Sequence, residues 1–192
     1  RNWNQMISKK TLRFILKYFF FTLIFFMLCA FQTSFWTVLI DFLPAPQLWL
    51  IFLVFIFLKW PSYSAIFYAY LLGYILTLFS MMPLKMSWLS VLGIFGFVWI
   101  FKNRIHSSSL FLFAILCGAC SLFYSVLYIA ISSYLETNKT SFLFVDRILQ
   151  AGITFLVSLI VYSALDALDR LFATQETWAA DAKDLNSHLG DI

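Results

Sequence analysis

Three polar residues stand inside the last long apolar run of the chain and are the strongest candidates for a functional site. Asp146 and Arg147 are neighbours, and Gln150 follows about one helical turn later. Polar and ionisable groups are expensive within a membrane-spanning helix, so each of them suggests a function. Neighbouring side chains on a helix point about 100° apart, so Asp146 and Arg147 should find partners on other helices or line a water-filled cavity. The sequence leaves open the alternative that they lie at the level of the lipid headgroups and stabilise the helix end.

No set of catalytic residues can be assembled around these positions. The histidines, His106 and His188, lie in a polar loop and in the polar tail, and neither has a Cys, Asp or second His at ligand spacing. Cys117 and Cys120 have the spacing of a redox or zinc pair, but no further thiol or suitably placed His completes a metal site. As small residues in an apolar run they favour close helix packing instead. We therefore expect no enzymatic activity, no metal and no cofactor.

Composition places these residues in a membrane protein. Hydrophobic residues make up 62% of the 192 residues and charged residues only 11%, whereas about a quarter of a soluble domain is charged. The net charge of +4 does not indicate binding to nucleic acid, because the basic residues lie at the ends of apolar runs and not on one face of a soluble fold. We predict an all-α, polytopic helical bundle that is solvated by membrane lipids.

The bundle is expected to occupy residues 18–170 and to contain about six helices. A basic cytoplasmic or interfacial segment, residues 1–17, precedes it, and an acidic cytoplasmic tail, residues 171–192, follows it. The second helix would be roughly 18–20 Å long, too short for a hydrocarbon core of about 30 Å, so either protein surrounds it or the bilayer thins. The predicted helices cover residues 18–40, 47–58, 62–79, 86–101, 108–135 and 141–168.

The placement of the basic residues predicts the orientation of the bundle. Only Lys85 and Lys139 fall in loops assigned to the far side of the membrane. By the positive-inside rule this bias puts both termini in the cytoplasm. Asp166 and Arg170 lie one turn apart and are expected to pair. The basic residues assigned to the cytoplasmic side are Arg1, Lys9, Lys10, Arg13, Lys17, Lys59, Lys102, Arg104, Arg170 and Lys183.

Glycines inside the apolar runs mark candidate contacts between helices. In lipid, small residues allow two helix backbones to approach closely, and van der Waals packing then drives association. The candidate packing residues are Gly73, Gly93, Gly96, Gly118 and Gly152.

The second and third predicted helices carry a pattern that resembles a known family. Residues 46–53, Pro-Gln-Leu-Trp-Leu-Ile-Phe-Leu, open a short apolar arm, and residues 59–62, Lys-Trp-Pro-Ser, turn it. Residues 72–80, Leu-Gly-Tyr-Ile-Leu-Thr-Leu-Phe-Ser, then lead into Met82-Pro83-Leu84-Lys85. In helix order and loop lengths, from about Tyr18 to Phe172, the chain is similar to the rod shape-determining protein MreD of bacteria. It departs from the family's pattern at Thr77, where the family usually carries an Asp, and at Lys85, where the family carries a glycine.

The resemblance implies a non-catalytic protein of the bacterial inner membrane with a fold similar to the substrate-binding component of vitamin-uptake transporters. It implies a single-span, MreC-like partner and an indirect link to the peptidoglycan synthase and to actin-like filaments. It also suggests an intramembrane cavity, and the candidate lining residues are Asp146, Arg147, Gln150 and Thr77. Two alternatives stay open: a small-molecule-binding membrane subunit of a vitamin-uptake transporter, and an accessory protein of a lipid carrier or flippase.

Overall fold

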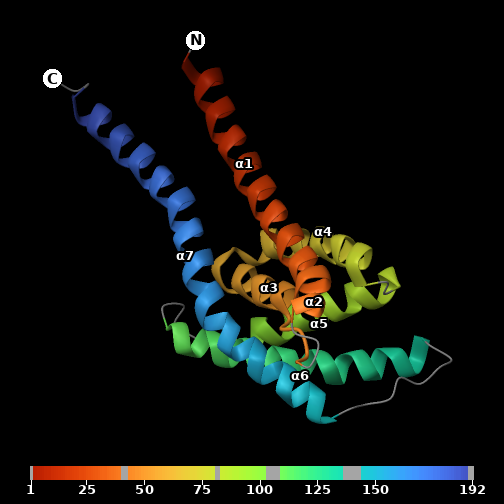
Figure 1. The fold of residues 1–192 in the computed structure, drawn as a ribbon. Helices are drawn as coiled ribbons and strands as arrows, with labels where there is room; N and C mark the ends of the chain where they lie inside the picture. Colours follow the sequence, from red (N-terminus) through yellow and green to blue (C-terminus); the bar gives the residue numbers. More distant parts are fainter. Residues whose placement is uncertain (1, 40–42, 81–82, 103–108, 136–143, 190–192) are drawn as a thin grey trace.

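The computed structural model is helical over most of the residues that it describes, which are 2–39, 43–80, 83–102, 109–135 and 144–189 (Figure 1). Side chains are described for most of these residues between 15 and 171. The predicted all-α helical bundle is confirmed. Its elements are α1 (Asn2–Ala30), the π-helical turn η1 (Phe31–Phe35), α2 (Trp36–Leu39), α3 (Leu48–Lys59), α4 (Ser62–Ser80), α5 (Leu84–Lys102), α6 (Leu110–Leu135) and α7 (Phe144–Leu189).

The prolines of the chain lie at the boundaries of these helices. Pro44 and Pro46 separate α2 from α3, where a ring without an N–H group cannot continue a helix. Pro61 directly precedes α4, and its carbonyl accepts a hydrogen bond from the Ala65 N–H at 3.0 Å. Pro83 precedes α5 in the same way, with its carbonyl 3.2 Å from the Ser87 N–H. Prolines that can be recognised in the sequence therefore mark the boundaries of several helices.

Among the residues that the structure describes, five helices are long and apolar enough to cross a membrane, which supports a multi-pass membrane protein. The helix α3 has only 12 residues and is too short to cross a membrane. The candidate spans are Ile15–Phe35, Ser62–Ser80, Leu84–Lys102, Leu110–Tyr134 and Phe144–Leu171.

The short helix α3 lies at the centre of the bundle. Its residues from Leu48 to Phe57 are all buried, and α1, α4, α5, α6 and α7 each pack against it. A helix that is apolar on every side needs such an enclosure. Of the two expectations for the short second helix, the structure therefore shows the first, in which protein surrounds it.

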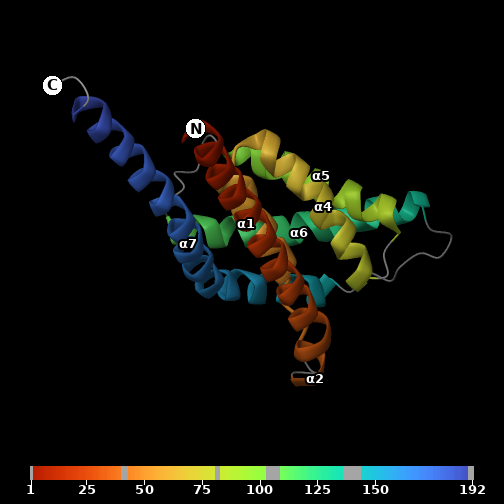
Figure 2. The same ribbon diagram turned by 90° about the horizontal axis from the view of Figure 1, so that it is seen from above.

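The first and last helices are longer than the sequence pattern predicted. α1 begins at Asn2, so the basic residues before Tyr18 continue the first span as helix. α7 runs to Leu189, well beyond residue 168, because residues 172–189 contain many good helix formers and neither glycine nor proline. The outer parts of both helices extend from the bundle on the same side (Figures 1 and 2). The predicted helix ends at residues 40, 108 and 141 lie outside the described residues.

Three of the five candidate glycines sit where helices touch. A Cβ atom added at Gly73 would lie 2.7 Å from Cδ1 of Trp88 in α5, and one at Gly93 would lie 2.5 Å from Cδ2 of Leu127 in α6. Gly118 faces Phe155 of α7 at 3.5 Å, which is ordinary contact. Gly96 and Gly152 have no neighbour within 4 Å of that position. The close approaches are thus confined to the α4–α5 and α5–α6 pairs.

We predict that Gly73→Ala lowers the free energy of unfolding by about 1–3 kcal/mol, because the added methyl group must displace the Trp88 ring. Gly152→Ala is the matched control and should be neutral or stabilising, since it gains helix propensity in open space. Thermal unfolding of the purified variants in one detergent measures both. Equal midpoints for the two variants would contradict the packing described here.

Candidate functional site

A polar cluster surrounds the first turn of α3 and contains two of the sequence-predicted site residues. The side-chain amide of Gln150 in α7 donates to the carbonyl of Ala45 at 2.9 Å. The guanidinium of Arg147 donates to Oε1 of Gln150 at 3.1 Å. This arrangement ties the first turns of α7 to the segment that enters α3.

Two further side chains accept hydrogen bonds from the backbone N–H groups at the start of α3. The Gln47 N–H donates to Oγ1 of Thr154 at 3.1 Å, and the Leu48 N–H donates to Oε1 of Gln32 at 2.9 Å. The first N–H groups of any helix lack partners within that helix. Because α3 begins inside the bundle, where water is scarce, side chains of α7 and η1 supply those partners.

Sequence reasoning missed Gln32 and Thr154. Both are polar residues within apolar runs, and Thr154 follows Gln150 by one helical turn, so its hydroxyl also donates to the Gln150 carbonyl at 2.7 Å. Gln32 lies in the π-helical turn η1, a distortion that is often found at functional positions. For Thr154, the available signal was its spacing of one helical turn from Gln150, which places both on one face of the helix.

The other two predicted cavity residues do not join this cluster. Asp146 is exposed in the first turn of α7, where a carboxylate is favoured by the helix dipole. This position matches the alternative in which the residue stabilises the helix end. Thr77 lies in α4, and its hydroxyl donates to the Tyr74 carbonyl of its own helix at 2.6 Å. The structure therefore brings Arg147 and Gln150 together and leaves Asp146 and Thr77 apart from them.

The chemistry of the polar cluster is that of a helix cap. Its amide, hydroxyl and guanidinium groups bind one another or the backbone that leads into α3. Gln47 contributes one buried acceptor, Oε1, which has no hydrogen-bond partner among the described residues.

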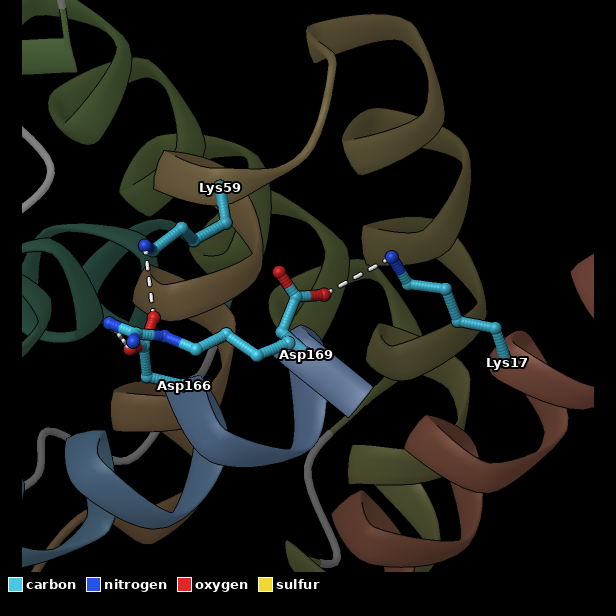
Figure 3. Close-up of polar contacts among 5 residues, drawn as sticks. Lys17, Lys59, Asp166 and Asp169 are labelled. Atoms are coloured by element: carbon cyan, nitrogen blue, oxygen red, sulfur yellow. Dashed lines mark ion pairs between the residues drawn. The ribbon is translucent and has the colours of Figure 1, made fainter. Parts of the chain in front are cut away.

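A second group of charged residues, the charge layer, lies at the opposite end of α3 (Figure 3). Asp166 of α7 pairs with Lys59 of α3 at 3.0 Å and with Arg170 at 2.8 Å. Asp169 of α7 pairs with Lys17 of α1 at 3.1 Å. The expected pair of Asp166 and Arg170 is present, and the layer extends it to two further helices.

The turn between α3 and α4 completes the charge layer. The Lys17 ammonium lies over the Trp60 ring, 5.2 Å from its centre, and the Lys102 ammonium of α5 donates to the Trp60 carbonyl at 2.7 Å. Trp60 itself is buried. Four basic residues that the sequence assigned to one side of the membrane, Lys17, Lys59, Lys102 and Arg170, thus gather at one end of the bundle.

The three cysteines lie inside the packed helical bundle. Cys29, Cys117 and Cys120 are free and buried. Within the described part of the chain, no group of three or more His, Cys, Asp or Glu residues could hold a metal ion.

Comparison with known proteins yields no relative: no family model, no curated protein and no solved structure matches this chain.

We predict that Thr154→Val destabilises the protein by about 1–3 kcal/mol, because it leaves the Gln47 N–H buried without an acceptor. Thr77→Val is the matched control. Its hydroxyl binds only a carbonyl of its own helix, so its loss should change stability by less than about 0.5 kcal/mol. Thermal unfolding in detergent compares the two, and an equal loss in both variants would contradict the capping role.

We also predict that Asp166→Asn destabilises the bundle by about 1–3 kcal/mol, because Lys59 loses its carboxylate partner in a half-buried site. Asp146→Asn, the same change at an exposed first-turn position, should cost about 0.3–1 kcal/mol through the helix dipole. Unfolding midpoints at low and high salt provide the measurement. A larger effect at Asp146 than at Asp166 would show that the charge layer does not hold the helices together.

Proposed function

We propose that this chain is a non-catalytic scaffold of the MreD type in the bacterial inner membrane. In this role it binds a single-span, MreC-like partner and helps to organise peptidoglycan synthesis and rod cell shape. Its connection to the peptidoglycan synthase and to actin-like filaments is indirect, through that partner. The short hairpin arm and the Lys-Trp-Pro-Ser turn at residues 59–62 are the sequence features that support the family resemblance.

The observation that carries the proposal is that the polar groups inside the bundle bind the two ends of α3. Arg147, Gln150 and Thr154 hold the entry to α3, and the charge layer holds its exit. Polar residues that pack a helix in place from both ends suit a rigid platform for other membrane helices. A transporter subunit would instead use Asp146 or Arg147 to hold a charged group of its ligand, and neither the exposed position of Asp146 nor the bond from Arg147 to Gln150 favours that alternative.

The proposed orientation places the charge layer and the outer parts of α1 and α7 in or near the cytoplasm. The support for it is the clustering of Lys17, Lys59, Lys102 and Arg170 at that end, together with the tendency of basic residues to remain on the cytoplasmic side. In this orientation the polar cluster at the entry to α3 lies towards the outer face of the membrane.

Single cysteines introduced at Thr137 and Ala173 test this orientation. The three native cysteines are buried, so a membrane-impermeant thiol reagent should report on the introduced ones. We expect Thr137→Cys to react from outside intact spheroplasts and Ala173→Cys to react only after lysis. Reaction of both from the same side would rule out the proposed order of helices.

Co-purification from the native host after mild detergent extraction tests the function itself. We expect a single-span protein with an extracytoplasmic coiled coil to remain bound. Recovery of the chain as a stable monomer without such a protein would contradict the scaffold role, and a tightly bound small molecule would favour the transporter alternative.

A further inference from the structure

The outward face of α4 carries a row of large, exposed side chains, mostly aromatic, of which Tyr70 stacks on one side against Trp88 of α5. These exposed residues recur at the spacing of one helix face, which places them in a single stripe. The stripe, called the tyrosine stripe below, consists of Tyr63, Phe67, Tyr70, Tyr74 and Leu78.

Two hydroxyl groups of this stripe lie at the wrong depth for lipid. α4 is long and apolar enough to span the membrane from Ser62 to Ser80, and at 1.5 Å per residue Tyr70 then lies about 12 Å from the first end and about 15 Å from the second. Tyr74 lies about 9 Å from the second end, but helical side chains lean towards the N-terminus, which carries its hydroxyl back towards the middle. Tyrosine is favoured at the interface, as at Tyr63, and not at the centre of a bilayer.

Neither mid-membrane hydroxyl is satisfied within the protein. Tyr70 is 55% exposed and Tyr74 is 53% exposed, and no described residue hydrogen-bonds either hydroxyl. The Tyr70 ring is stacked on Trp88 at 4.2 Å, so it cannot swing freely towards the interface. An acyl chain offers no donor or acceptor, and a polar group left unpaired in hydrocarbon is costly. The stripe therefore calls for a polar partner that is itself inside the membrane.

A groove beside the stripe provides room for such a partner. It has a volume of about 510 Å³ and lies between α1 and α4. The two helices are fixed to each other there, because the hydroxyls of Thr22 and Tyr68 form a hydrogen bond of 2.7 Å. The groove is lined by Ile15, Tyr18, Phe19, Thr22, Tyr63, Ser64, Phe67, Tyr68 and Leu71.

We propose that the transmembrane helix of a single-span partner protein lies in this groove and against the tyrosine stripe. Its backbone carbonyls, or Ser, Thr, Asn or Gln side chains, accept hydrogen bonds from Tyr70 and Tyr74. Small residues on its contacting face let it approach closely enough for those bonds. This inference rests on the proposed scaffold function and adds to it the surface at which the partner binds.

Site-specific photocrosslinking in membranes of the native host tests the inference. A benzophenone amino acid is introduced in place of Tyr74, and in a matched control in place of Ile160, which is 76% exposed near the middle of the α7 span. We expect the first position to capture one single-span membrane protein, identified by mass spectrometry, and the second to give no protein adduct. Only lipid adducts at Tyr74, or a crosslink to a second copy of this chain, would overturn the inference.

The same experiment separates this inference from the proposed function. If a single-span partner co-purifies with the chain but crosslinks from Ile160 and not from Tyr74, the scaffold role stands and the docking face is wrong. If no partner co-purifies at all, both are overturned.

The double variant Tyr70→Phe/Tyr74→Phe removes the two hydroxyls and keeps the rings. A hydrogen bond between membrane helices changes affinity by about threefold, so we expect about a ninefold loss of partner affinity for the pair. Tyr134→Phe is the control, because Tyr134 is 91% exposed on α6 and lies outside both the stripe and the groove. Titration of partner recovery against detergent concentration provides the readout, and unchanged recovery with the double variant would contradict the hydrogen bonds.

Discussion

The structure depends on one constraint: a helix too short to cross a bilayer must have at least one end inside it. Backbone N–H and C=O groups in hydrocarbon have no water to bind, so an end of α3 that lies within the membrane needs partners from the protein. The polar cluster of Gln32, Gln150 and Thr154 supplies them at the entry. At the exit, the charge layer brings α1, α5 and α7 to the last turn of α3 and to Trp60. The remaining helices form the enclosure that keeps the apolar surface of α3 out of contact with water and lipid.

The two ends of α3 are held by interactions of different kinds. At the entry, the bonds to the backbone leading into α3 come from neutral amide and hydroxyl groups, which are suited to a dry environment, and the charged Arg147 bonds the Gln150 amide from a part-buried position. The exit uses ion pairs that are only half-buried, so water and counterions still reach them. This difference between the two ends fits an arrangement in which one end of α3 lies deep in the bundle and the other lies near the membrane surface. In the proposed scaffold, this rigid centre fixes the positions of the outer helices, so that their exposed faces are preorganised for other membrane helices.

The sequence predicted the local features of this architecture well and the long-range features poorly. Prolines, apolar run lengths and the short second helix are read over a few residues, and they placed α3, α4, α5 and α6 within a few residues of their observed ends. The length of α3 left two alternatives, enclosure by protein or a thinned bilayer, and the structure shows the enclosure. The lengths of α1 and α7 did not follow, because a polar helix that continues an apolar span has no change of pattern at the membrane surface. The high helix propensity of residues 172–189 was the signal in the sequence that α7 continues beyond its apolar part.

The candidate site could be predicted only in part for the same reason. Arg147 and Gln150 were found because polar residues are rare in an apolar run, but their partner, the Ala45 carbonyl, is a backbone atom far away in sequence. Asp146 and Arg147 were expected to point about 100° apart, but the sequence did not show which of them joins the cluster: Asp146 is exposed, whereas Arg147 bonds Gln150. Thr77 entered through a family pattern, and its hydroxyl serves its own helix. The pairing of Lys59 with Asp166 joins opposite parts of the chain, and charge type alone cannot select it among the available partners.

The most direct test of this account is amide hydrogen exchange at the entry to α3, measured by NMR on the protein in lipid nanodiscs. First-turn amides normally exchange quickly because they lack partners within the helix. We predict that the amides of Gln47 and Leu48, which donate to Thr154 and Gln32, exchange at least tenfold more slowly than the first-turn amide of Lys85 in α5. Equal exchange rates at the three positions would show that the entry to α3 is not capped within a closed bundle, and the central claim would be wrong.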